Sequence, residues 1–393
     1  MRRKKLLLAA ISGAVALGLV EVALRLSLDA DGTFFGRPLP PFGAVNHAAQ
    51  RSWLAARQAP DGWAPRIGSF DAELGWTVTP DRRDRIAGVE IRTNSLAARG
   101  AREYAAAPPA GTTRLLCFGD SYTFCIGVAD ADTWQAQLEA LDDGVEAINF
   151  GVGAYGVDQA LLRFRRVGPA LRPDALCIGI MLENIGRHVN RYRPVYFPQS
   201  PMPFTKPRFV LRDDRLELLP SPYATGPDLA RAIADGSVID AVRDGEYWLE
   251  PAPPLAFLCT SRLLAGWFAY ARRREWSALW QATDGEPFRV TLALLEAFHR
   301  EALTAGARAA PVLVFPSQMD LEWVTAGNAP FWTTLTDALR ARGIEFLDLS
   351  PALLAALGDR PPAAFYFGGH LVPEGNAVVA REVLAWTRRR LGR

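Results

Sequence analysis

RLLCFGDSYTFCIGV, residues 114–128, is an apolar run that breaks into Gly-Asp-Ser. Residues 115–118 have the length and composition of a short buried strand. An ordinary turn would explain Gly119 and Asp120. A nucleophile placed at the edge of a sheet would also explain Ser121, because ligands bind beyond the carboxyl ends of parallel strands. The rest of the chain has to separate these two interpretations.

Short apolar strands and helical segments alternate along the chain. Such alternation is typical of a parallel sheet with right-handed crossovers and helices on its faces, so we expect an α/β fold. The predicted strands are 115–118, 145–150, 175–181, 312–315 and 344–347, and the predicted helices include 133–141, 158–164 and 375–390.

The N-terminus carries an export or membrane signal. MRRKK is followed by fifteen uncharged residues, 6–20, and then by Glu21 and Arg25. Fifteen residues fit the apolar region of a signal peptide, whereas the segment continued to residue 28 is long enough to cross a bilayer of about 30 Å. Since no convincing small-x-small cleavage site ends the run, we favour an uncleaved anchor. In either case the basic cluster stays inside and the body of the protein is exported.

Three regions are predicted, with boundaries at residues 28 and 111. Residues 1–28 are the membrane anchor or signal, 29–111 are a linker and a small β-rich lead-in, and 112–393 are the main domain. An insertion at about 190–290 interrupts the main domain, with a hairpin at 207–219. We expect its aromatic residues to build a satellite core rather than contact substrate: Tyr247, Trp248, Trp267, Phe268, Tyr270, Trp276 and Trp280.

Composition argues against several classes of partner. The net charge is +2 and the body of the chain holds no Lys/Arg-rich block, so no nucleic-acid partner is expected. The four cysteines show no CxxC or Cys/His spacing, which gives no support to a metal site or a disulfide framework. No cofactor is expected, and the oligomeric state stays open.

A serine nucleophile needs a base, and the chain has four histidines. His47 lies in the predicted linker, His188 follows the third strand, and His299 lies among charged residues on a helix. His370 lies in YFGGHLVPEGN, residues 366–376, a glycine-flanked loop before the last helix. This position makes His370 the candidate base.

Two further loops at strand ends can supply hydrogen-bond donors. Residues 149–156, NFGVGAYG, contain three glycines that let backbone N–H groups turn toward an anion. Asn184 follows the third strand and offers a side-chain amide. Backbone and Asn donors together are what an oxyanion hole requires.

Taken in order, the serine, the glycine loop, Asn184 and His370 resemble the four motif blocks of the SGNH (GDSL-type) hydrolases, in particular bacterial membrane-anchored members. The resemblance is close over 112–185 and looser over 310–390. It implies a three-layer, flavodoxin-like parallel sheet. It also implies Ser121 as nucleophile and His370 as base, with an oxyanion hole formed by Ser121, Asn184 and the backbone of Ala154.

One departure from the family pattern concerns the acid that orients the histidine. The family usually has an aspartate two or three residues before it, where this chain has Gly368 and Phe367. A backbone carbonyl can orient His370, or Asp348 or Glu374 can substitute. A third alternative is a weak or inactive enzyme.

The expected function is therefore that of a serine esterase, exported and anchored in the bacterial inner membrane. It would act on an acyl ester, with O-acetyl as one option, of a carbohydrate or lipid. Two alternatives stay open: an O-acyltransferase for cell-envelope polysaccharide, and a non-catalytic glycan-binding protein on a degraded SGNH scaffold.

Overall fold

A five-stranded parallel sheet forms the centre of the computed structural model, which describes residues 2–42, 48–59, 62–63 and 68–392. The strand order is β13-β12-β9-β7-β8. Numbered along the chain, this order is 2-1-3-4-5, which is the flavodoxin-like arrangement that the resemblance implied. The α/β prediction is confirmed. The strands are β7 (Thr113–Gly119), β8 (Val145–Gly151), β9 (Ala175–Met181), β12 (Val312–Phe315) and β13 (Phe346–Asp348).

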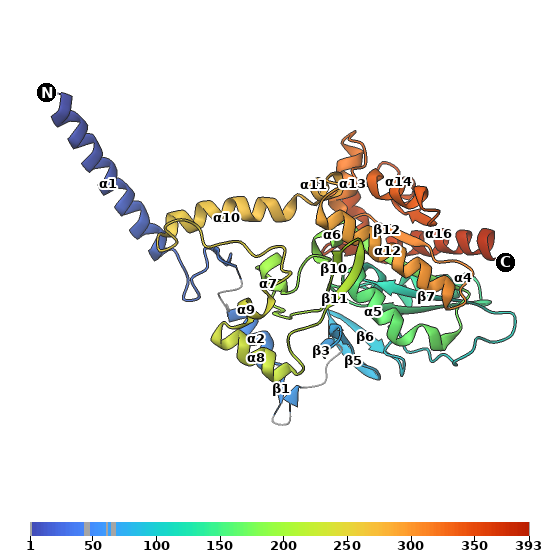
Figure 1. The fold of residues 1–393 in the computed structure, drawn as a ribbon. Coiled ribbons are helices and arrows are strands. Elements are labelled where there is room, and N and C mark those ends of the chain that lie inside the picture. The colour runs from blue at the N-terminus through green and yellow to red at the C-terminus, as the bar shows by residue number, and fades with distance from the viewer. Residues whose placement is uncertain (1, 43–47, 60–61, 64–67, 393) are drawn as a thin grey trace.

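Helices cover both faces of this sheet, which makes three layers (Figure 1). Alternate residues of β7 belong to opposite cores: Leu116 and Phe118 pack in one, Leu115 and Cys117 in the other. All residues of β7 and β8 are therefore buried. The first core includes α5 (Val157–Val167), α12 (Glu286–Thr304) and α14 (Thr333–Ala341); the second includes α4 (Trp134–Leu141), α13 (Gln318–Thr325), α15 (Ser350–Leu357) and α16 (Pro373–Leu391).

The lead-in consists of two antiparallel hairpins, β3 (Gly68–Asp71) with β4 (Gly75–Val78) and β5 (Arg82–Ile86) with β6 (Val89–Thr93). A short pair, β1 (Gln58–Ala59) with β2 (Gly62–Trp63), precedes them.

The segment predicted as a linker packs against the protein instead. Leu39 and Phe42 are buried, and so is Leu54 of α2 (Ala48–Ala55). The amide of Gln50 donates a hydrogen bond to the carbonyl of Ser200 at 3.2 Å. The Pro and Gly content of this segment favoured a linker. The apolar side chains between the Pro and Gly residues nevertheless pack against the rest of the protein.

The insertion holds a hairpin and five helices beside the sheet. The hairpin turns at Asp213 and Asp214, both at positive φ, as a two-residue turn requires. The aromatic residues of the insertion divide into two groups, since Trp248 and Trp280 are fully buried whereas Trp267 is 76% exposed. A satellite core therefore explains only part of them. The elements are α7 (Arg193–Tyr196), β10 (Arg208–Arg212), β11 (Arg215–Leu219), α8 (Gly226–Asp235), α9 (Val238–Val242), α10 (Cys259–Arg274) and α11 (Trp276–Gln281).

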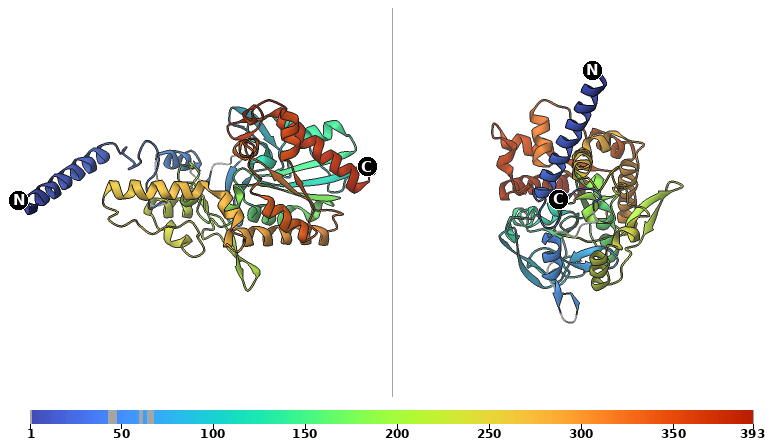
Figure 2. Two further views of the ribbon diagram at one scale, coloured as in Figure 1. Left: turned by 90° about the horizontal axis from the view of Figure 1, so that it is seen from above. Right: turned by 90° about the vertical axis from the view of Figure 1, so that its left-hand side faces the viewer.

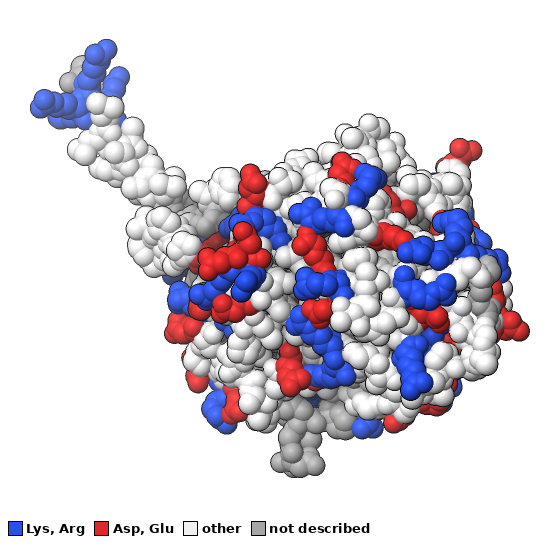
Figure 3. Space-filling model, turned by 45° about the vertical axis from the view of Figure 1, so that its right-hand side comes forward, with Lys and Arg blue, Asp and Glu red and all other residues white. Residues whose placement is uncertain are grey.

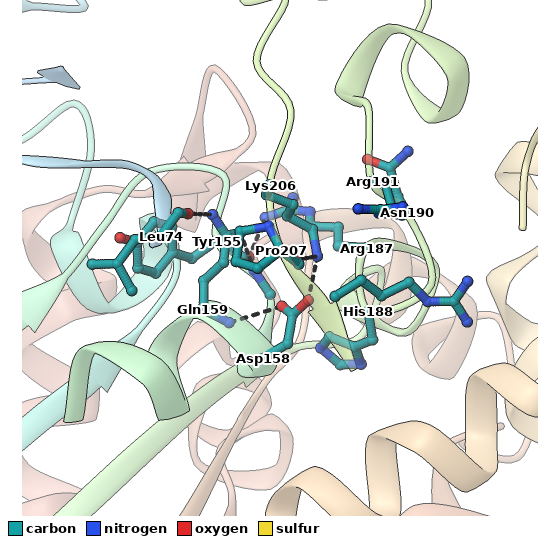
Figure 4. Close-up of polar contacts among 12 residues, drawn as sticks. Leu74, Tyr155, Asp158, Gln159, Arg187, His188, Asn190, Arg191, Lys206 and Pro207 are labelled. Carbon is teal, nitrogen blue, oxygen red and sulfur yellow. Dashed lines mark hydrogen bonds and ion pairs between the residues drawn. The ribbon is translucent and has the colours of Figure 1, made fainter. Parts of the chain in front are cut away.

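A buried ion pair ties the insertion to the sheet domain (Figure 4). The ammonium of Lys206 contacts the carboxylate of Asp158 in α5, with side chains 3% and 1% exposed. The neighbouring Gln159 donates to the carbonyl of Leu74 in the lead-in at 2.7 Å. Insertion, lead-in and sheet domain thus meet around α5.

The N-terminal helix α1 (Arg2–Leu26) projects away from the body, and α10 lies between it and the sheet (Figures 1 and 2). None of its residues is buried, and it is apolar and long enough to cross a membrane. Figure 3 shows an uncharged rod tipped with Lys and Arg, next to a body of mixed charge.

Candidate active site

Ser121 begins α3 (Ser121–Phe124), directly beyond the carboxyl end of β7. The Asp120 carboxylate caps this helix by accepting a hydrogen bond from the Tyr122 N–H at 2.8 Å. Gly119 is required for space, because a Cβ there would lie 2.8 Å from the Gly179 carbonyl oxygen. The Gly-Asp-Ser turn therefore has a local structural reason, and it also places the serine at the sheet edge.

A cavity of about 550 Å³, here called the catalytic cavity, opens over Ser121. It lies at the carboxyl ends of β7, β8 and β9, where the strand order reverses and ligands bind in flavodoxin-like sheets. Ala154, Arg187 and His370 share its wall with Ser121. Helix α2, the lead-in and the insertion supply most of its apolar lining, including Trp53, Trp76, Val78, Met202 and Phe204.

His370 lies on a tight hairpin between β14 (Tyr366–Phe367) and β15 (His370–Leu371). Gly368 and Gly369 form the turn at φ +56° and +81°, a conformation that favours glycine. The Nδ1 atom of His370 lies 3.2 Å from the Gly368 carbonyl oxygen. Since a carbonyl only accepts, Nδ1 carries the proton and Nε2 keeps its lone pair.

The surroundings of His370 favour the neutral imidazole. Burial lowers its pKa below 6.5, while the Asp120 carboxylate and the Gly368 carbonyl oppose that shift and the Arg187 charge adds to it. Tyr122 packs against the imidazole with ring centroids 5.4 Å apart, and its hydroxyl donates to the Gly369 carbonyl at 2.9 Å. Tyr122 therefore fixes the turn that carries the histidine.

Neither carboxylate proposed from the sequence contacts the histidine. Asp348 accepts hydrogen bonds from the Trp332 indole at 2.9 Å and from the Ser350 N–H at 2.9 Å. Glu374 pairs with Arg360 at 2.8 Å on the surface. Among the described residues, the Gly368 carbonyl is the group hydrogen-bonded to the His370 ring. The structure thus shows the backbone-carbonyl alternative.

Three residues on the cavity wall, Ser121, Gly153 and Ala154, have backbone N–H groups that are unpaired within the described part of the chain. Ala154 has φ +67°, a left-handed conformation that costs a non-glycine residue about 1–2 kcal/mol. Strain of this kind at a cavity wall is a feature of functional sites.

Asn184, the third predicted donor, begins α6 (Asn184–Arg187) at the end of β9. Its amide donates to the Asp120 carboxylate at 2.6 Å, and its Oδ1 has no described partner. The amide is therefore bound to Asp120, the residue that directly precedes Ser121 in the Gly-Asp-Ser turn.

Arg187 is a site residue that the sequence analysis missed. It lies one turn after Asn184 in α6, so it lies on the same side of that helix. Its guanidinium contacts the Glu183 carboxylate and donates to the Tyr155 carbonyl at 3.1 Å. Its charge opposes the rise in the pKa of Asp120 that burial causes. In the sequence, the i, i+3 spacing from Asn184 was the feature that could have indicated Arg187 as a site residue.

The other histidines have structural surroundings. His188 is fully buried with its Nδ1 near the Thr291 hydroxyl at 2.6 Å, and burial lowers its pKa well below 6.5. His299 lies 3.3 Å from the Ala310 carbonyl oxygen and is half-buried. His47 lies outside the described residues. Within the described ranges, no group of three His, Cys, Asp or Glu side chains is placed to hold a metal.

Ser121 Oγ has no hydrogen bond to any described residue, His370 included. In free enzymes catalytic hydrogen bonds are often long or not yet formed, because they tighten when substrate binds. The arrangement brings together a hydroxyl, a neutral imidazole with a free Nε2 and unpaired N–H donors. These groups can carry out acyl transfer.

Neither a protein-family model nor a curated protein matches the sequence. The chain resembles the solved structure of a G-D-S-L family lipolytic protein from Veillonella parvula, with TM-score 0.33 and 13% identity over 71% of this chain and 100% of the other. A catalytic mutant of an acetylxylan esterase from Geobacillus stearothermophilus gives 0.35 and 14% over 72% and 96%. An alpha/beta hydrolase from the Lake Arreo metagenome gives 0.35 and 16% over 71% and 96%. With TM-scores below 0.5, function has to be inferred from the site itself.

Proposed function

We propose that the protein is a membrane-anchored serine esterase of the SGNH type, with Ser121 and His370 acting as a dyad. One observation carries the proposal: Ser121 and His370, far apart in the sequence, line one cavity that unpaired backbone N–H groups also line. A turn without catalytic purpose gives no reason for this convergence.

The proposed reaction follows from the roles of these groups. His370 Nε2 takes the proton of Ser121 Oγ as the oxygen attacks the acyl carbonyl carbon. The N–H groups of Ser121 and Ala154 stabilise the developing oxyanion, and the third donor would be the second N–H of the Asn184 amide, whose first N–H donates to Asp120. The imidazolium then protonates the leaving alcohol, and an acyl-enzyme remains. Water, or a sugar hydroxyl in a transferase, accepts the acyl group in the second half.

The backbone carbonyl of Gly368 would hold the imidazole in the productive tautomer. A carbonyl carries no full charge, so it stabilises the imidazolium less than an aspartate does. We therefore expect slower turnover than in a complete triad. The lack of an aspartate beside His370 also supports the rival function, a glycan-binding protein without catalysis.

Covalent labelling tests the proposal most directly. A fluorophosphonate probe should label the full chain in detergent, and Ser121→Ala should abolish the labelling. The His370→Gln variant should slow it by at least about 10³-fold, because the serine loses its base. Ser237→Ala, which changes an exposed serine that does not line the cavity, is the matched control. Well-folded protein that is never labelled would establish the non-catalytic rival instead.

Anchoring by α1 forms the second half of the proposal. Glu21, near the end of α1, accepts hydrogen bonds from the backbone N–H groups of Cys259 at 2.7 Å and Thr260 at 3.0 Å. These are the first residues of α10, so α1 supplies the N-terminal cap of a helix in the body. That contact supports an anchor that is kept over a signal that is removed, with the catalytic domain on the exported side.

A further inference from the structure

Two more cavities adjoin the catalytic cavity and lead toward α1. The first, here called the arginine cavity, measures about 390 Å³ and shares Arg187 and Arg193 with the catalytic cavity. The second, the α10 groove, measures about 470 Å³ and shares Arg37, Tyr270 and Arg274 with the arginine cavity. The three cavities follow one another, with the nucleophile at one end and α10 at the other.

Two of the guanidinium groups in the arginine cavity are neutralised by carboxylates. Arg187 is paired with Glu183, and Arg273 with Glu250 at 3.0 Å. Arg273 also donates to the carbonyls of Val195, Ala269 and Trp248. These two arginines are part of the framework.

Three other arginines of this cavity, Arg37, Arg193 and Arg274, have no carboxylate within ion-pair distance among the described residues. Arg193 donates to the Ser200 hydroxyl at 3.1 Å, and burial lowers its pKa to about 10. Unpaired guanidinium groups around one cavity form a site for an oxyanion such as a phosphate, which they bind through several N–H donors.

The α10 groove has a different character, because its wall is mostly apolar. Phe34, Leu39, Leu263 and Trp267 line it. Such a surface accepts a hydrocarbon chain, not a charged or heavily hydrated group.

The outer face of α10 continues this apolar surface into the solvent. Leu264, Trp267 and Phe268 are 64–76% exposed and lie at i, i+3 and i+4, which puts them on one side of the helix. The preceding loop exposes Leu255 and Phe257 as well. Because α1 caps the start of α10, this face lies where α1 leaves the bilayer, and Trp and Phe are suited to that interface.

We propose that Ser121 acts on an ester carried by the head group of an anionic membrane lipid. The phosphate-type anion would bind Arg193, Arg37 and Arg274, and the hydrocarbon would follow the α10 groove into the bilayer. This proposal rests on the esterase function proposed above and names its substrate class.

The order of the cavities determines the order of groups in the substrate. The arginine cavity lies between the catalytic cavity and the α10 groove, so the anion lies between the ester and the hydrocarbon. An ester that joins the hydrocarbon itself to the lipid would lie on the wrong side of the anion. In the reaction the ester C–O bond breaks, the acyl group bonds to Ser121 Oγ, and the serine proton leaves with the head-group hydroxyl; water then releases the acid.

The experiment measures how lipids protect Ser121 from a small neutral fluorophosphonate. The full chain is placed in phosphatidylcholine vesicles, with or without phosphatidylglycerol, and glycerol 1-phosphate is added separately as a soluble anion. We expect phosphatidylglycerol to slow labelling by roughly tenfold, the factor that about 1.4 kcal/mol of binding provides. Glycerol 1-phosphate at the same phosphate concentration should have little effect, because it has no hydrocarbon chain.

Variants then identify the site. The double variant R193Q/R274Q should lose the protection by phosphatidylglycerol. Arg272→Gln is the matched control, since Arg272 is on α10 but lines none of the three cavities. Labelling that phosphatidylglycerol leaves unchanged would overturn the lipid proposal while the esterase function stands. Equal protection by soluble glycerol 1-phosphate would overturn it in favour of a soluble anionic substrate. No labelling of Ser121 in any vesicle would overturn the esterase function itself.

Discussion

At the scale of single residues, the proposed chemistry depends on which ring nitrogen of His370 carries the proton. Its Nδ1–H donates to the Gly368 carbonyl and its Nε2 is free, so the neutral imidazole is the form that the proposed mechanism requires. In the proposed dyad, a peptide carbonyl on a two-glycine turn holds the imidazole, where the SGNH pattern has a charged aspartate. A carbonyl stabilises the imidazolium less than a carboxylate does, but it holds the ring in the same tautomer.

The first prediction concerns pH. Because burial lowers the pKa of His370 below 6.5, kcat/KM for a soluble ester should rise with pH and reach half its maximum below pH 6.5. Asp120→Asn removes a negative charge that raises this pKa, so the half-maximum should move to still lower pH. A half-maximum above pH 6.5 in the native chain would contradict the proposed surroundings of the imidazole.

The second prediction concerns Tyr122 as a positioning residue. Tyr122→Phe removes the hydrogen bond to the Gly369 carbonyl, worth about 1 kcal/mol, and should lower kcat by roughly fivefold with little change in KM. Tyr104→Phe is the control, since it loses a comparable bond to Glu139 outside the catalytic cavity. If both variants lower kcat equally, Tyr122 has only a structural role.

At the scale of elements, buried polar contacts hold the insertion against α5. The Lys206–Asp158 pair lies in the interior, where one charge without the other is strongly unfavourable. Burial raises the pKa of Asp158, and the Lys206 charge opposes that rise. The position of the cavity walls therefore depends on an ion pair whose residues do not themselves line the catalytic cavity.

The third prediction follows from this pair. Lys206→Met should lower the free energy of unfolding by about 3–5 kcal/mol, because Asp158 is left buried and unpaired. The double variant K206M/D158L should recover most of this loss. Arg243→Gln, which breaks an exposed pair with Asp240, should change stability by at most about 0.5 kcal/mol. Chemical denaturation of the full chain in detergent measures all three, and a double variant as unstable as the single one would contradict the explanation.

At the scale of the whole molecule, α1 and α10 determine where the cavities face. The two helices meet at Glu21 and the start of α10, and the sheet lies at the far end of α10 (Figure 2). The three adjoining cavities also lead from the sheet, where the catalytic cavity lies, along α10 toward α1.

The fourth prediction concerns the N-terminus. If α1 is the anchor proposed above, protein isolated from membranes should keep residues 2–28 and should resist alkaline carbonate extraction. Mass spectrometry of the N-terminal peptide measures the first point directly. A mature chain that begins after residue 16, following Ala14-Val15-Ala16, would show a cleaved signal and overturn the anchor.

Much of the architecture was determined locally and could be predicted from the sequence. Strand and helix periodicity gave the parallel sheet, although β13 begins two residues after the predicted start at Ile344. Turn chemistry placed Ser121 after β7 and His370 beside two glycines. Composition could not tell that Leu39 and Phe42, in the segment predicted as a linker, are buried against the rest of the protein.

Only the tertiary structure decided what surrounds those residues. It set the Gly368 carbonyl against His370, kept Asp348 and Glu374 on other partners, and brought Arg187 and Arg193 to the cavity wall. The physical reason is the range of the interactions. A turn or a strand is determined by neighbours in the chain, whereas a hydrogen bond or a cavity wall joins side chains whose distance depends on the packing of every element between them.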